Sequence, residues 1–111
     1  IGAALIRSLA ARATPPRMFA LALGTAELKR TRAALPVHVQ LVIVPCDLAD
    51  RAAAARVGTE LAERVARGAV LIHNAGVWPA RREVVGGVER AYATQVLGRL
   101  AVQAPLLAAG V

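Results

Sequence analysis

The sequence feature that most restricts the fold of this chain is an alternation of short apolar runs with longer helix-like segments. Three runs are predicted to be strands, at Met18–Leu23, Val37–Cys46 and Ala69–His73. Met18–Leu23 is continuously apolar, a pattern typical of a strand buried on both faces of a parallel sheet, and the second run has a β-branched centre at Leu41–Val44. Because helix-like segments separate the strands, the connections are predicted to be right-handed crossovers. The order predicts an α/β, doubly wound parallel sheet with three strands and about four helices.

Helix signals flank these apolar runs. The predicted helices cover Ala3–Ala13, Ala26–Leu35, the residues between Asp50 and Gly68, and Val88–Ala104. Thr25 and Asp50 are predicted N-caps, because a side-chain oxygen at that position accepts an N–H of the first turn. Proline disrupts helices, so Pro36 is expected to end the second helix and Pro105 to kink or end the fourth. A Gly86–Gly87 turn is expected before the fourth helix.

The composition indicates one small globular domain over residues 1–111. Hydrophobic residues make up 57% of the chain and aromatic residues 3%, so Ala, Leu and Val must build the core. Cys46 is the single cysteine, which excludes an internal disulfide, and with only His38 and His73 beside it no metal site is expected. No secretory signal and no complete membrane-length apolar stretch are present, so we expect a cytoplasmic location without a membrane partner.

The net charge of +7 raises the question of a nucleic-acid partner. The basic residues are nearly all Arg and are scattered along the chain. Proteins that bind single strands interleave basic side chains with stacking aromatic ones. Because Phe19, Trp78 and Tyr92 are the only aromatic residues, the sequence predicts no nucleic-acid binding.

The segments that follow the three predicted strands are the candidate ligand site, because ligands of doubly wound sheets bind outside the carboxyl ends of the strands. These segments are Gly24–Thr25, Cys46–Leu48 and Asn74–Gly76. From the residues alone, Asp47 has a second interpretation, as a carboxylate that stabilises the start of the next helix. Asn74 and Gly76 have one too, as turn residues.

Four motifs of this chain resemble those of the short-chain dehydrogenase/reductase family. They occur in the order found in the family and together span the chain. Asn74-Ala75-Gly76 resembles the family's Asn-Ala-Gly signature, and Asp47-Leu48 resembles its adenine-contacting acidic position. Ile1-Gly2 resembles the end of its glycine-rich phosphate loop. Tyr92–Gly98 resembles its long helix, with Gln95 at the position of the family's Asn. The resemblance implies an incomplete Rossmann-like fold, in which residues 1–111 are a partial dinucleotide-binding domain.

The resemblance also implies a nicotinamide cofactor, NAD(P), and the residues that bind it. These residues are Ile1, Gly2, Asp47, Leu48, Asn74, Ala75 and Gly76. The first two would end a phosphate cradle at a helix N-terminus, the Asp-Leu pair would contact adenine, and the Asn-Ala-Gly loop would lie beneath the nicotinamide ribose. Leu23 and Gly24 are uncharged where the coenzyme is selected, but Lys29, Arg30 and Arg32 follow, which slightly favours NADP.

The family's catalytic Tyr-x-x-x-Lys pair is absent from these 111 residues. Tyr92 is followed four residues later by Val96, and the only lysine is Lys29. Gln95 is the one catalytic position that the resemblance assigns. Its amide is displaced by one methylene relative to Asn, roughly 1.5 Å, which weakens the family's proton relay. The sequence therefore predicts an inactive fragment of a longer parent, without the first strand and the catalytic half.

Two functions follow from these observations. The parent is expected to be an NAD(P)-dependent oxidoreductase that transfers a hydride between the nicotinamide cofactor and a small alcohol or carbonyl substrate. The alternative, suggested by Gln95, is a non-catalytic dinucleotide-binding or interaction protein on the same scaffold. Because the family commonly pairs through the long helix around Gln95, the resemblance implies a homo-oligomer for the full-length parent.

Overall fold

The computed structural model describes every residue from Ile1 to Val111 and divides into two compact units. The first unit is Ile1–Pro45 and the second is Cys46–Val111. The chain is of mixed α/β class and contains a two-stranded parallel sheet. None of its helices is both long enough and apolar enough to cross a lipid bilayer.

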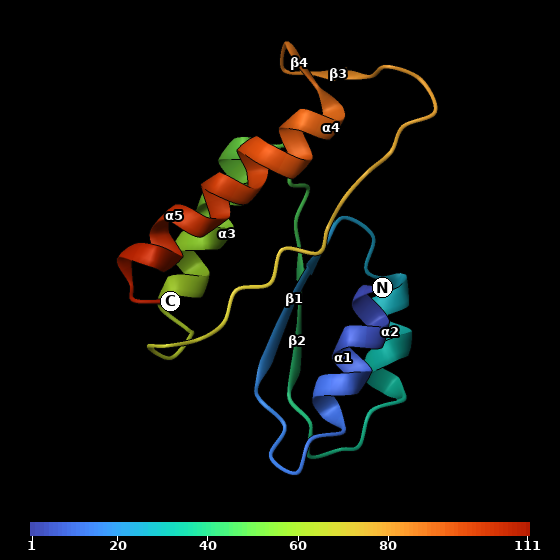
Figure 1. Cartoon of the computed structure of the whole chain (residues 1–111), viewed down its shortest axis with the longest axis vertical. Coiled ribbons are helices and arrows are strands. Elements are labelled where there is room, and N and C mark those ends of the chain that lie inside the picture. The colour runs from blue at the N-terminus through green and yellow to red at the C-terminus, as the bar shows by residue number, and fades with distance from the viewer. The chain divides into compact units, whose positions relative to one another are not determined.

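The first unit contains two parallel strands joined through a helix (Figure 1). Its elements are α1 (Gly2–Ala10), β1 (Met18–Ala22), α2 (Ala26–Ala33) and β2 (Leu41–Pro45). The two strands pair in register from Met18 opposite Leu41 to Ala22 opposite Pro45. Parallel strands need a long crossover connection, which α2 provides here. The predicted parallel pairing of the first two apolar runs is therefore confirmed, with both strands shorter than predicted.

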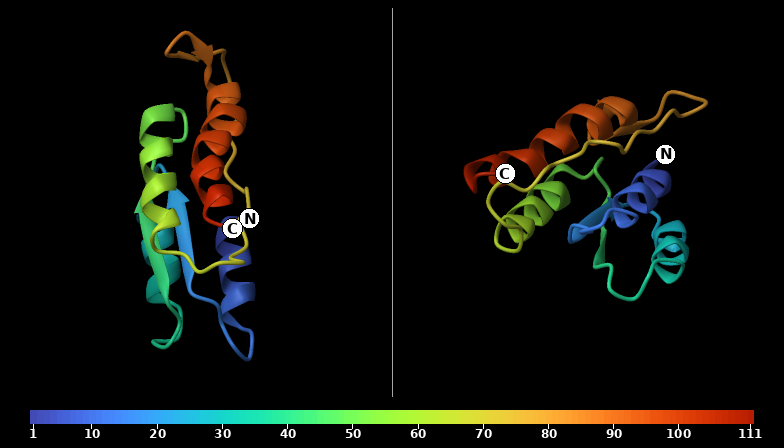
Figure 2. Two further views of the ribbon diagram at one scale, coloured as in Figure 1. Left: turned by 90° about the vertical axis from the view of Figure 1, so that its left-hand side faces the viewer. Right: turned by 60° about the horizontal axis from the view of Figure 1, so that its bottom comes forward.

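The core of the first unit consists of aliphatic side chains from both helices and both strands. Its buried members are Ile6, Ala10, Met18, Val39 and Leu41, and Leu9, Ala20, Leu28 and Leu35 pack against them. The apolar faces of α1 and α2 thus cover one side of the strand pair, as Figures 1 and 2 show. This is the layered packing that hides the apolar face of a small sheet from water.

The second unit consists of two helical stretches and a short hairpin. Helix α3 is Arg51–Ala62, and β3 (Val84–Val85) pairs antiparallel with β4 (Val88–Glu89). Helix α4 (Arg90–Tyr92), the π-helical turn η1 (Ala93–Gly98) and α5 (Arg99–Ala108) follow one another without interruption. Figure 2 shows α3 running beside α5, and these two helices make the main contact of the unit.

Helices α3 and α5 approach closely because a glycine lies at their contact. A Cβ on Gly58 would lie 2.6 Å from the carbonyl oxygen of Val102 and 2.8 Å from Cγ of Pro105. No side chain other than hydrogen fits at that position without a shift of the α5 backbone. The residues buried on these two helices are Ala54, Gly58, Leu61, Val102 and Leu106.

The helix caps and the hairpin turn test three local predictions. The Asp50 carboxylate accepts a hydrogen bond from Ala53 N at 3.0 Å, so the predicted cap of α3 is confirmed. Thr25 is the N-cap residue of α2, as predicted, but its side chain does not make the expected capping hydrogen bond. Gly86 and Gly87 form the predicted turn with φ values of +56° and +79°, which favour glycine and suit a tight hairpin.

The third predicted strand, Ala69–His73, does not form. A strand needs a neighbour that exchanges backbone hydrogen bonds with it, and no strand of the second unit pairs with this segment. Its apolar side chains Val70 and Ile72 are exposed. The strand prediction is therefore wrong here, because an apolar run indicates a tendency to be buried but does not supply a partner.

The ends of the second-unit helices also differ from the prediction. Pro105 does not end the fourth helix, since it lies inside α5, which continues to Ala108, and the predicted kink stays a prediction. Helix α3 ends at Ala62, before the predicted stop at Gly68, although Gly68 does have a positive φ of +76°. The unexpected π-helical turn η1 contains Gln95, and such turns are frequent at functional sites.

Candidate functional site

Gln95 joins the helical stretch of the second unit to the Asn-Ala-Gly loop. Its side-chain Oε1 accepts a hydrogen bond from the backbone N–H of Val77 at 2.9 Å. The same oxygen lies 3.5 Å from the position of a Cβ on Gly76, an ordinary contact distance. The π-helical turn thus holds the residue that directly follows Gly76. The Gln95 side chain is long enough for its amide oxygen to reach the backbone of the loop.

Two further side chains of the same helix face contact this segment. The Arg99 guanidinium donates a hydrogen bond from Nη2 to the carbonyl oxygen of Ala75. Gln103 Oε1 lies 3.0 Å from His73 Nε2. Residues four apart on a helix share a face and lie about 6 Å apart. Two residues of extended chain span about 6.6 Å, so the two spacings match.

These contacts form an antiparallel set, which we call the side-chain ladder. It pairs His73 with Gln103, Ala75 with Arg99 and Val77 with Gln95. The exposure of the segment alternates accordingly: Asn74 and Gly76 are exposed, whereas Ala75 and Val77 are partly buried. The Asn74 amide makes no hydrogen bond and does not bridge to a neighbouring loop.

The Asp47-Leu48 segment contacts the π-helical turn through Gly98. A Cβ on Gly98 would overlap the carbonyl oxygen of Leu48 and would lie 2.8 Å from the carbonyl carbon. The backbone of Leu48 therefore lies directly on the helix surface at Gly98, and only glycine permits this approach. The turn η1 is thus contacted by both segments that the sequence predicted as cofactor-binding within the second unit.

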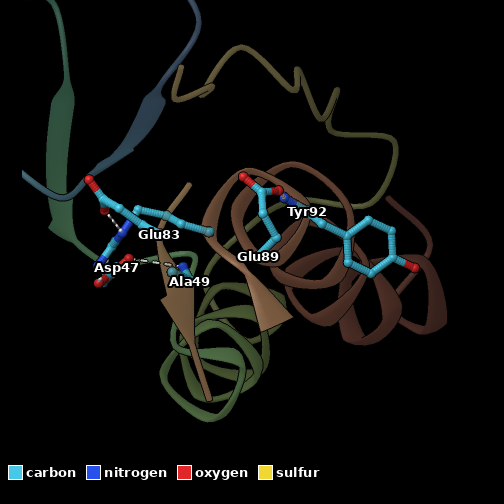
Figure 3. A network of polar contacts seen from close by, with 6 residues as sticks. Asp47, Ala49, Glu83, Glu89 and Tyr92 are labelled. Atoms are coloured by element: carbon cyan, nitrogen blue, oxygen red, sulfur yellow. Dashed lines mark hydrogen bonds and ion pairs between the residues drawn. The ribbon is translucent and has the colours of Figure 1, made fainter. Parts of the chain in front are cut away.

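Asp47 is held by its own turn and by an arginine of α4 (Figure 3). Its Oδ1 accepts a hydrogen bond from Ala49 N at 2.9 Å, and its Oδ2 lies 3.9 Å from Nη1 of Arg90. The Arg90 Nε lies 2.8 Å from Oε2 of Glu83. The Asp47 side chain is 37% exposed. The Asp47 side chain is therefore partly accessible, and its Oδ2 is paired only through a long ionic contact.

This geometry supports the structural interpretation of Asp47, and the adenine contact stays a prediction. The Asp47–Ala49 hydrogen bond stabilises the turn that leads into α3, as the structural interpretation requires. The cap itself is Asp50, so Asp47 Oδ2 is not needed for the helix. That oxygen is free to accept a hydrogen bond from a ligand, as the adenine interpretation requires.

Cys46 precedes this site and is buried. Burial raises the pKa of its thiol, the negative charges of Asp47 and Asp50 raise it further, and Arg56 opposes them. The thiol therefore stays protonated at neutral pH and behaves as a small apolar side chain.

Ile1 and Gly2 lie in the first unit, at the start of α1. The carbonyl of Ile1 accepts a hydrogen bond from Leu5 N at 3.0 Å, and no side chain caps this helix. The first N–H groups of α1 are thus available to an anion, as at any uncapped helix N-terminus. Their predicted role at a pyrophosphate stays a prediction.

Within the second unit, an open groove runs between α3 and α5, away from the predicted cofactor-binding residues. It is lined mainly by apolar side chains, among them Ala52, Ala55, Leu97 and Leu100. No three potential metal ligands among the His, Cys, Asp and Glu side chains lie together in the chain. The polar chemistry of this unit is concentrated around η1.

The structure thus brings Leu48 and the Gly76–Val77 backbone to one π-helical turn, at Gly98 and at Gln95. Ala75 is bonded to Arg99 of α5, and Asp47 lies near Arg90 of α4. Sequence analysis did not identify Arg90, Arg99 or Gln103 as part of this region. The spacing of Gln95, Arg99 and Gln103 at four-residue intervals was a usable signal, since it places three polar side chains on one helix face. In comparisons with known proteins, no family model, no curated protein and no solved structure matches this chain.

Proposed function

We propose that the second unit binds a nicotinamide dinucleotide as part of a Rossmann-like oxidoreductase that resembles the short-chain dehydrogenase/reductases. The observation that carries the proposal is the convergence of two separate segments on η1. Leu48 contacts this turn at Gly98, and Val77 is bonded to it at Gln95. These segments are the two that the resemblance assigns to adenine and to the nicotinamide ribose, although Leu48 and Asn74 are 26 positions apart in the chain.

The residues present fit such a cofactor. Asp47 offers a partly accessible carboxylate to the adenine amino group. Gly76 is exposed, so a ribose can approach its backbone from the solvent side, away from the Gln95 amide that its Cβ position faces. When bound, the nicotinamide ring would supply or accept the hydride. The protein residues would bind and orient the cofactor.

One observation favours a second candidate, a dinucleotide-binding protein without catalysis. Gln95 Oε1 is already bonded to Val77 N, so the amide oxygen is used to hold the loop. In the family that this chain resembles, the Asn at this position helps to hold a water of the proton relay. One lone pair of this oxygen is therefore used for the loop, and the direction of the side chain is set by the loop and not by a water. The geometry suits cofactor binding better than proton transfer.

Equilibrium binding of NADPH and NADH tests the proposal. Trp78, the only tryptophan, is 93% exposed and lies two residues after Gly76, so its emission reports on a bound nicotinamide by energy transfer. We expect saturable binding of both, with NADPH tighter. We also expect no carbonyl reduction by the 111-residue chain, since it has no Tyr-x-x-x-Lys pair.

The variant Asp47→Asn is the matched test of the adenine contact. Asn keeps the hydrogen bond to Ala49 N but removes the charge. A charged acceptor is stronger than a neutral one by about 1 kcal/mol, so we expect about fivefold weaker binding. Glu60→Gln, at an exposed position of α3, is the control and should bind as wild type. Absence of saturable binding in the wild-type chain would refute the proposed function.

A further inference from the structure

The side-chain ladder fixes which groups of the Asn-Ala-Gly loop face the helix and which face away. In an extended chain, alternate residues present their backbone groups to opposite sides. The Ala75 carbonyl and the Val77 N–H are bonded to Arg99 and Gln95 on the helix side. Asn74 and Gly76, which alternate with these two residues, are exposed and make no hydrogen bond to the helix. A loop of this kind has no regular backbone partner, so its direction depends on these side chains.

Arg99 makes the strongest contact of the ladder. Its guanidinium is the only charged group among the three helix residues, and charge-assisted hydrogen bonds are about twice as strong as neutral ones. Its Nε is buried and has no hydrogen-bond partner. The Ala75 carbonyl is therefore the hydrogen-bond partner that holds the partly buried Arg99 guanidinium.

The two neighbouring ladder contacts are weaker constraints on the loop. Gln95 bonds to Val77, which follows the Asn-Ala-Gly residues. Gln103 contacts His73, which precedes them and is itself exposed. Only Arg99 contacts the middle residue of the three. A change at Arg99 is therefore expected to alter the backbone direction of Asn74–Gly76. A change at Gln103 is expected to affect only His73, which precedes these residues.

We infer that Arg99 is a positioning residue for dinucleotide binding: by holding the Ala75 carbonyl it fixes the loop with the backbone of Asn74 and Gly76 exposed to the cofactor. This inference rests on the proposed function and extends it to a residue outside the four family motifs that the sequence showed. Arg99 itself does not contact the cofactor. Its effect passes through the backbone of the Asn74–Gly76 loop.

The test measures NADPH affinity, through energy transfer from Trp78, for Arg99→Ala, Arg99→Lys, Gln103→Ala and the control Arg82→Ala. We expect about tenfold weaker binding for Arg99→Ala and a smaller loss for Arg99→Lys, which keeps the charge but not the planar fork. Arg82 is exposed and makes no hydrogen bond or ion pair, so Arg82→Ala should bind as wild type. Gln103→Ala should stay within about twofold of wild type, since a neutral contact at the edge of the loop contributes little.

Chemical rescue separates positioning from a general loss of structure. Methylguanidine added to Arg99→Ala should restore most of the affinity without changing the midpoint of urea unfolding. Amide hydrogen exchange at Val77, the hydrogen-bonded N–H of the loop, should rise in free Arg99→Ala, and exchange in α3 should stay unchanged. If the wild type binds NADPH and Arg99→Ala binds equally well, the inference fails and the proposed function stands. If methylguanidine rescues nothing and α3 also exchanges faster, the role of Arg99 is structural and the inference fails. If the wild type does not bind, both fail.

Discussion

Leu48 and Gly98 are in direct backbone contact, because the Leu48 carbonyl oxygen occupies the space where a Cβ of residue 98 would stand. The contact joins the turn before α3 to the π-helical turn η1. It also explains a glycine in the middle of a helical stretch, where glycine is otherwise unfavourable by about 1 kcal/mol relative to Ala. Because the contact is so close, a side chain added at Gly98 should change the stability of the second unit.

Gly98→Ala is expected to destabilise the second unit strongly. The clash is with backbone and cannot be relieved by rotating a side chain, so the loss should be about 3 kcal/mol or more. Urea unfolding followed by circular dichroism measures it. Gly24→Ala is the control, since nothing lies within 4 Å of a Cβ there and its φ is not positive. Equal stability of the two variants would contradict the contact between Leu48 and Gly98.

Gly58→Ala tests whether helix packing outweighs helix propensity. In an isolated helix this change stabilises by about 1 kcal/mol. Here the new methyl group would meet the Val102 carbonyl at 2.6 Å and Pro105 at 2.8 Å. We therefore expect a net loss of about 1 to 3 kcal/mol in the free energy of unfolding. The neighbouring exposed change Thr59→Ala should have little effect, and a stabilised Gly58→Ala protein would show that α3 and α5 are farther apart.

The two predicted N-caps should differ when they are removed. Asp50→Ala loses the hydrogen bond to Ala53 N and should reduce the free energy of unfolding by about 1 kcal/mol. Asp50→Asn keeps an acceptor and should lose less. Thr25→Ala removes no capping hydrogen bond and should leave α2 nearly unchanged. Thermal unfolding compares the three variants, and a larger loss at Thr25 than at Asp50 would be inconsistent with these caps.

The raised pKa of the Cys46 thiol predicts how stability changes with pH. The unfolded chain releases this proton near the ordinary thiol pKa, about 8.5, whereas the folded protein keeps it to higher pH. Stability from this group is therefore complete below that pH and is lost as the pH rises from there through the folded pKa. Urea unfolding at several alkaline pH values should show this decline, and Cys46→Ala should lack it. The thiol should also react slowly with a disulfide reagent at neutral pH and faster in urea.

The sequence was sufficient for the parts of the fold that depend on local patterns. The apolar runs that became β1 and β2, the Asp50 cap and the Gly86–Gly87 turn follow from residues close together in the chain. Such features are determined by side-chain chemistry and by the φ angles that glycine allows. The same patterns failed at Ala69–His73, because a strand is defined by its neighbour and an apolar run does not contain one.

In the candidate site, too, some features follow from the sequence and others depend on the tertiary structure. The sequence by itself determined which residues carry cofactor-like motifs: Asp47-Leu48, Asn74-Ala75-Gly76 and Gln95. Only the tertiary structure decided that the π-helical turn contacts both segments, that Arg99 holds Ala75, and that Gly98 allows Leu48 to approach. A motif indicates the chemistry of individual positions in the chain. Contacts between residues far apart in the chain depend on how helices and loops pack, and that packing is set by the whole unit.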